Sequence, residues 1–122
     1  MKKIEIFEQV INSEKPVDLR KVGINKTMFW AYRSSVEAGN DLLNFDDAIW
    51  DEDIPEIVEI CKEADITEFT ISSKFSGLIE TLALFEAHDW EMNGLTRVKS
   101  KHTDWSTKER EIIPAIKMTR RA

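Results

Sequence analysis

The sequence contains 122 residues, of which 42% are hydrophobic and 33% charged, and its formal net charge is −6. This length suits one domain around one hydrophobic core, and the small numbers of glycine and proline exclude a disordered or linker-rich chain. The longest apolar runs are only a few residues, so no segment is expected to cross a bilayer.

The first forty residues are predicted to be helical. Glu5 and Glu8 interrupt the stretch where a signal peptide would be apolar, which argues against secretion. Hydrophobic residues recur there at helical spacing: Ile4, Phe7, Val10 and Ile11. Pro16 ends this helix or opens the next, and Asn25 is the predicted N-cap of a second helix that stops at Gly39. One face of this second helix carries Met28, Phe29, Tyr32 and Val36.

From residue 41 onward the sequence predicts alternating strands and helices. Leu42–Phe45 and Glu68–Ser73 are predicted strands, because the first is short and apolar and the second alternates. Asp53 is the predicted cap of the helix between them, with Pro55 in its first turn and Glu56 at the capping-box position. The apolar stripe of this helix is Ile54, Ile57, Val58, Cys61 and Ala64.

Another helix is predicted after the second strand, with Ser73 or Ser76 as its cap. Its core-facing residues are predicted to be Leu78, Ile79, Leu82 and Phe85. The segment Ser100–Met118 then has the pattern of two strands joined by a tight turn. Because Pro114 cannot donate to a strand ladder, the last strand is expected at an edge or at a bulge.

These elements together predict an α/β fold, with α+β as the alternative. A helical pair precedes the order strand, helix, strand, helix, strand, strand, in a mixed sheet of about four strands that ends in a β-hairpin. Residues 1–122 are expected to form a single domain, in which the helical residues 1–40 pack on the α/β residues 41–122.

Charge is distributed unevenly along the chain. From Glu37 to Glu68 there are twelve acidic residues and one lysine, whereas residues 97–122 contain eight basic and three acidic residues. Five of the acids form a dense run: Asp46, Asp47, Asp51, Glu52 and Asp53. This run is a candidate contact face for a basic partner, and its twin aspartates are also candidate magnesium ligands or acid–base groups. The simpler interpretation assigns the run to a turn and to the positive end of a helix.

The loop SSKFSG, residues 72–77, follows a predicted parallel strand and opens a helix, which is where α/β folds bind ligands. Four of its residues form a candidate anion-binding loop together with the backbone amides: Ser72, Ser73, Lys74 and Ser76. The loop matches neither glycine-rich phosphate-binding pattern, and helix capping by serine explains the same residues.

The chain has four tryptophans, which either close edges of the core or contact a partner: Trp30, Trp50, Trp90 and Trp105. Three basic residues share one strand face of the hairpin and are candidate partner contacts together with Trp105: Arg97, Lys99 and Lys101. Glu109 and Glu111 on the other strand are expected to neutralise part of this basic row. We interpret Trp105, at or beside the hairpin tip, as a lid over lysine stems in preference to a contact point.

The sequence offers few groups for catalysis. Its histidines and cysteine are His88, His102 and Cys61, and no zinc-binding spacing or nucleophile elbow is present. Cys61 falls on an apolar helix face, where it acts as a small hydrophobic residue, and a lone cysteine suits the reducing cytoplasm. We therefore predict a cytoplasmic protein with no catalytic residue, no metal and no cofactor.

Four phrases of the sequence carry a resemblance: DIPEIV, EFTISS, FSGLIETLALFE and TDWSTKEREIIPAIKM. With them, Gly39 to Met118 resembles a family of small bacterial cytoplasmic proteins of unknown function from Gram-positive gut bacteria, often encoded beside conjugative or other mobile elements. The resemblance covers nearly the whole chain and implies a whole-chain domain in a mobile-element context. Accessory genes in that context often encode regulators or inhibitors of host defence.

Three functions are consistent with these observations. The sequence favours a non-enzymatic accessory domain that binds a basic protein partner, for example by imitating the phosphates that a nucleic-acid-binding defence protein recognises. A small-ligand or phosphoester-binding enzyme would instead join Asp46 and Asp47 to Ser72, Ser73 and Lys74 in one pocket. A weak nucleic-acid binder would use the basic hairpin, although the acidic balance argues against nucleic acid. The oligomeric state is left open.

Overall fold

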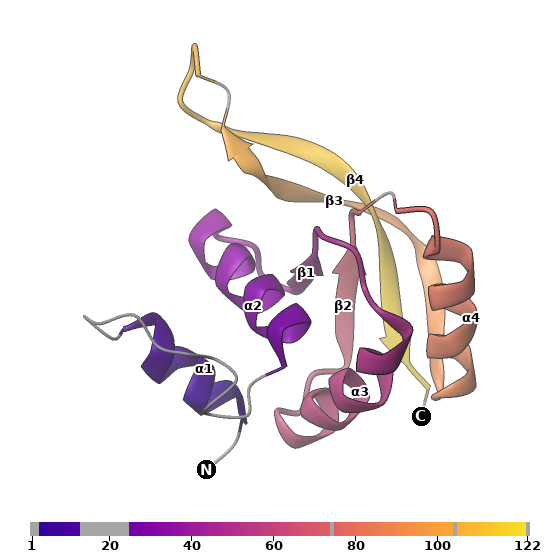
Figure 1. The fold of residues 1–122 in the computed structure, drawn as a ribbon. Helices are drawn as coiled ribbons and strands as arrows, with labels where there is room; N and C mark the ends of the chain where they lie inside the picture. The colour runs from indigo at the N-terminus through magenta and orange to yellow at the C-terminus, as the bar shows by residue number, and fades with distance from the viewer. Residues whose placement is uncertain (1–2, 13–24, 74, 104, 122) are drawn as a thin grey trace.

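The computed structural model describes residues 3–12, 25–73, 75–103 and 105–121. Within these ranges the chain forms helices and one four-stranded sheet (Figure 1). In chain order the elements are α1 (Lys3–Ile11), α2 (Lys26–Ala38), β1 (Leu43–Phe45), the 3-10 turn η1 (Asp51–Asp53), α3 (Ile54–Glu63), β2 (Glu68–Ile71), α4 (Leu78–Ala87), β3 (Trp90–Thr103) and β4 (Arg110–Arg120). Pro16 lies outside the described residues, so the helix boundary placed there stays a prediction.

The strand order in the sheet is β1-β2-β4-β3. β1 and β2 are parallel, with Leu43 opposite Phe69, whereas β4 runs antiparallel to both of its neighbours. This confirms the predicted mixed α/β sheet with a carboxyl-terminal hairpin. Helix α3 connects β1 to β2 and α4 connects β2 to β3, so each crossover places a helix against the sheet.

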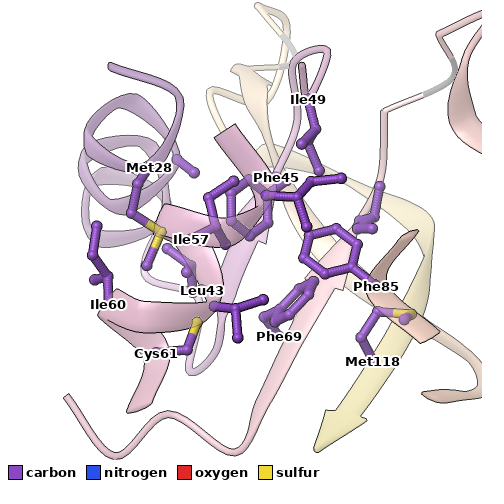
Figure 2. Close-up of a cluster of buried hydrophobic side chains, with 14 of the residues drawn as sticks. Met28, Leu43, Phe45, Ile49, Ile57, Ile60, Cys61, Phe69, Phe85 and Met118 are labelled. Atoms are coloured by element: carbon purple, nitrogen blue, oxygen red, sulfur yellow. The ribbon is translucent and has the colours of Figure 1, made fainter. Parts of the chain in front are cut away.

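The core lies between these helices and the sheet face that carries Phe69. The Phe69 ring is fully buried, and its centroid lies 5.2 Å from that of Phe45, 5.1 Å from that of Phe85 and 4.6 Å from that of Trp90. Figure 2 shows side chains from α3, β1, β2, α4 and β4 converging on this cluster. The predicted stripe of α3 is confirmed, because Ile54, Ile57, Val58 and Cys61 are all buried.

One residue that was predicted to face the core, Ile79, and one residue of the predicted apolar face of α2, Val36, are exposed. The buried side of α4 carries Leu82 and Phe85, and Leu78 packs against the core. Ile79 is the next residue after Leu78 and is therefore turned about 100° around the helix, which leaves it 78% exposed. Val36 is 55% exposed although it follows Phe29 by two turns of α2. Phe7 of α1 covers the Phe29 end of this side, with ring centroids 5.7 Å apart, whereas Val36 at the other end faces a groove.

The helix ends follow the sequence signals in α2 and depart from them elsewhere. The Asn25 side chain accepts a hydrogen bond from the Met28 amide, and Gly39 adopts a left-handed φ of 75°, so both predicted ends of α2 are confirmed. Asp53 occupies the predicted N-cap position of α3 and Pro55 lies in the first turn, but the Asp53 side chain makes no capping hydrogen bond, so only the position is confirmed. The predicted serine cap of α4 was wrong, because Gly77 occupies the N-cap position.

Pro114 lies in an interior strand, which corrects the prediction of an edge strand. β4 is flanked by β2 and β3, but its pairing with β2 ends at Ile116, opposite Ile71. Beyond that point one side of β4 has no strand partner, so the missing N–H of Pro114 breaks no ladder bond. The predicted bulge is not found at Pro114. The strand pairing is instead irregular on β3, around Gly94, whose φ is 76°. The connection between β3 and β4 spans residues 104–109 and is longer than a tight turn.

The hairpin is tied to the body of the domain by Asn40. Its side-chain oxygen accepts a hydrogen bond of 2.8 Å from the Lys99 amide, and its side-chain nitrogen donates one of 2.9 Å to the Lys99 carbonyl. Asn40 thus offers β3 the pair of bonds that a neighbouring strand would supply. The region of the hairpin beyond Lys99 projects from the body (Figure 1).

Replacing Asn40 by alanine is expected to lower the free energy of unfolding by about 1–2 kcal/mol, because two hydrogen bonds are lost. The Lys99 amide should exchange its hydrogen faster, which two-dimensional NMR in D2O measures directly. Asn40→Asp is the matched control, since it keeps the acceptor for the Lys99 amide and loses the donor. An unchanged exchange rate at Lys99 in the alanine variant would contradict this role of Asn40.

Candidate functional site

The two loops that the sequence singled out leave the sheet side by side. The Ser72 amide donates to the Phe45 carbonyl at 3.0 Å, and the Asn44 side-chain nitrogen donates to the Ser72 hydroxyl at 2.9 Å. The carboxyl ends of β1 and β2 are therefore joined by hydrogen bonds, as parallel neighbours require. The Ser72 hydroxyl is engaged in this scaffold. Ser73 is half-buried, Ser76 is exposed, and Lys74 lies outside the described residues.

The run of five acids divides into residues with different surroundings. The Asp53 carboxylate accepts hydrogen bonds from Asn25 at 3.1 Å and from Thr27 at 2.7 Å, so it links η1 to the start of α2. Asp46 and Asp47 line a groove of about 210 Å³ against α2, which Lys26 also lines. Asp51 and Glu52 are exposed on η1.

Trp50 separates this groove from a larger one, which we call the Trp50 groove. It has a volume of about 550 Å³ and is lined by Ala48, Ile49, Trp50, Asp51, Glu52, Phe75, Ser76, Gly77 and Thr81. It lies at the carboxyl ends of β1 and β2 and at the start of α4, where open α/β sheets commonly bind ligands. The structure thus brings Ser76 of the serine loop together with Asp51 and Glu52 of the acidic run.

The electrostatics of the Trp50 groove favour a cation. The start of α4 supplies roughly half a positive charge, whereas Asp51 and Glu52 each supply a full negative charge. Among the described residues that line this groove none is basic, in contrast to the neighbouring groove with Lys26. An anion in the Trp50 groove would therefore meet net repulsion from the two carboxylates.

Trp50 is the aromatic residue of this surface that is most available to a partner. Its side chain is 65% exposed although it stands beside a groove. Trp30 also borders the smaller groove, but the Arg33 guanidinium lies over its ring at 5.4 Å from the centroid. From the sequence, Trp50 was only one of four tryptophans, and Phe75 was not singled out. The sequence signal that could have identified this site is Trp50 followed directly by three acidic residues.

The arrangement does not favour the phosphoester chemistry that the sequence left as an alternative. That chemistry needs the twin aspartates and the serine loop to line one cavity. Asp46 and Asp47 line the groove on one side of Trp50, and neither Ser72 nor Ser73 is among the described residues that line it. Cys61 is fully buried, and this burial raises the pKa of its thiol to about 12, so it is held as a neutral thiol. Among the described residues no cluster of histidine, cysteine and acidic side chains could hold a metal ion.

The hairpin presents its candidate contacts differently from the prediction. Trp105 is 91% exposed, so little of its side chain packs against the hairpin, which does not fit the lid interpretation. Arg97 lies opposite Pro114 and Lys99 opposite Ile112, so hydrophobic residues and not glutamates face the basic row across the ladder. Both basic side chains are exposed. The Lys101 side chain lies outside what the structure describes.

The fold and this surface together define a small α/β domain with an acidic, tryptophan-bearing groove at its parallel strand ends and a projecting β-hairpin. No helix in the described ranges has the length and apolar character needed to cross a membrane. The chain belongs to the family described as Domain of unknown function (DUF7698), whose model matches residues 27–120. The match begins in α2, so α1 lies before it. No curated protein and no solved structure matches the chain.

Proposed function

We propose that this protein is a non-enzymatic, protein-binding domain whose Trp50 groove binds a basic segment of a partner protein. The observation that carries the proposal is the exposed indole of Trp50 beside two exposed carboxylates, in a groove whose described lining residues include no basic side chain. Tryptophan is enriched at binding hot spots, and complementary charge steers the encounter with a partner.

The groove suits the two parts of an arginine or lysine side chain. Trp50 and Phe75 provide aromatic surface for the aliphatic stem or for stacking of a guanidinium. Asp51 and Glu52 at the rim provide acceptors for its charged end. Discrimination against neutral or acidic segments then follows from the charge of these two residues.

The sequence resemblance gives this binding a biological setting. The basic partner of such a mobile-element accessory protein would be a host nucleic-acid-binding or defence protein, and the acidic stretch from Asp41 to Glu68 would imitate the phosphates of its substrate. This refinement is a proposal that rests on the resemblance and on the acidic surface.

Trp50→Ala is expected to weaken binding of a short oligoarginine peptide by about tenfold or more, because the aromatic wall of the groove is lost. Fluorescence anisotropy with a labelled peptide measures this change. Ile79→Ala is the matched control, since it removes an exposed hydrophobic residue that does not line the groove. Equal affinity of the wild type and the Trp50 variant would remove the groove from the proposal.

Salt dependence provides a second test. Binding between exposed charges is screened over about 10 Å at 0.1 M salt, so the affinity for oligoarginine should fall steeply as salt is raised. An oligoglutamate peptide should not bind at any salt concentration. Affinity for oligoarginine that is independent of salt would overturn the charge-based recognition.

A further inference from the structure

The hairpin carries an exposed face that is both hydrophobic and basic, in the part that precedes its projecting end. Leu95 is 78% exposed, Ile112 is more than half exposed, and Pro114 is exposed as well. Arg97 pairs with Pro114 and Lys99 with Ile112, so these side chains lie next to one another on the same face. We call this face, formed by Leu95, Arg97, Lys99, Ile112 and Pro114, the hairpin strip.

The hairpin strip continues the sheet face that is buried in the body of the domain. On β4, Met118 and Ile116 share a face with Pro114 and Ile112, because side chains alternate along a strand. Met118 is fully buried and Ile116 packs against the core, whereas the residues beyond them are exposed. The strip therefore continues this sheet face beyond the buried core, with the Lys99 ammonium group lying beside Gly39 at the end of α2.

The charges on the strip determine which kind of surface can cover it. Two copies of the strip packed against each other would bring Arg97 and Lys99 of one copy against those of the other, which is repulsive. Neither side chain has an ion-pair partner among the described residues. A complementary surface must present a hydrophobic group flanked by carboxylates.

The Trp50 groove is a surface of this kind on the same chain. It presents the exposed Trp50 indole directly beside the exposed Asp51 and Glu52. We propose that the hairpin strip of one copy of the protein packs against Trp50, Asp51 and Glu52 of a second copy. This inference rests on the proposed function, since it names a basic surface that the groove recognises.

Each copy carries both surfaces, so two copies can exchange the contact reciprocally, as in a two-fold symmetric dimer. The exposed state of both surfaces shows that they do not cover each other within one chain. Self-association would then compete with a basic partner for the groove. Binding of a basic partner to the groove would therefore dissociate the dimer into monomers.

A charge-swap experiment tests this contact. The wild type should dimerise in sedimentation velocity at low salt and at concentrations up to about 0.5 mM, well above the dissociation constants of most transient complexes. The variant Arg97→Glu/Lys99→Glu and the variant Asp51→Lys/Glu52→Lys should each associate at least about tenfold more weakly. An equimolar mixture of the two variants should restore the dimer, because both exchanged contacts are again complementary. Lys62→Glu is the control, since it reverses an exposed charge elsewhere and should leave association unchanged.

The outcomes separate this inference from the proposed function. The Arg97→Glu/Lys99→Glu variant keeps an intact groove, so it should bind oligoarginine at least as tightly as the wild type. A wild type that stays monomeric at the highest concentration but binds oligoarginine would overturn the dimer contact alone. A wild type that dimerises while the mixture of variants does not would place the interface elsewhere and overturn the inference equally.

Discussion

Replacing Phe69 by alanine is expected to lower the free energy of unfolding by about 3–5 kcal/mol, which is the usual cost of truncating a buried aromatic residue. Phe69 has no exposed surface, and its ring contacts those of Phe45, Phe85 and Trp90. These rings come from β1, α4 and β3, so the cavity would loosen three elements at once. A loss of this size is a large fraction of the stability of a small domain.

Urea unfolding followed by tryptophan fluorescence measures this change, because the Trp90 indole lies within the affected cluster. Trp105→Ala is the matched control, since its exposed side chain should change the free energy of unfolding by less than about 0.5 kcal/mol. Equal destabilisation by the two substitutions would show that Phe69 is not central to the core.

The sequence predicted those features of the fold that depend on local patterns. Periodicity identified α2, α3 and α4, and the short apolar and alternating stretches identified β1 and β2. The parallel β1–β2 pair followed from the crossover through α3, and the antiparallel hairpin was predicted as well, although its connection is longer than the tight turn expected from the sequence. Asn25 and Gly39 were also identified, because their capping interactions form within α2 and its ends.

The errors fall where a distant contact decides the outcome. Pro114 is accommodated in an interior strand because β2 is short, which is a property of the partner strand and not of β4. Asp53 has the sequence pattern of a helix cap, but its carboxylate bonds to Asn25 and Thr27, which precede it by more than twenty residues. Trp50 lines a groove together with Phe75 and Ser76, which come from a different loop of the chain. None of these relations has a local signature.

The acidic run shows why residue type alone did not define the site. Asp53 holds two elements together, whereas Asp51 and Glu52 are exposed at the Trp50 groove. A sequence presents all of these acids as equivalent members of one negatively charged face. The structure separates them by their hydrogen bonds, and this separation can be measured, because stability and binding should respond to different members of the run.

Asp53→Ala is expected to lower the free energy of unfolding by about 2–4 kcal/mol, because two hydrogen bonds to a charged acceptor are lost and the Asn25 and Thr27 donors lose an acceptor. Asp51→Ala is the matched control within the same turn, and its exposed side chain should cost less than about 0.5 kcal/mol. Chemical denaturation of both variants measures the difference. Affinity for oligoarginine should show the opposite order at a temperature where both variants are folded, with the larger loss in Asp51→Ala.

A double-mutant cycle with Thr27→Val isolates the contact itself. If the Thr27 hydroxyl stabilises the fold through Asp53, as their separation of 2.7 Å indicates, the two substitutions together should cost less than the sum of the single costs by about 1 kcal/mol or more. Strict additivity of the two free-energy changes would contradict this coupling, and Asp53 would then be grouped with the exposed acids Asp51 and Glu52. Coupling together with unchanged peptide affinity in Thr27→Val would establish that the acids of η1 divide between folding and binding.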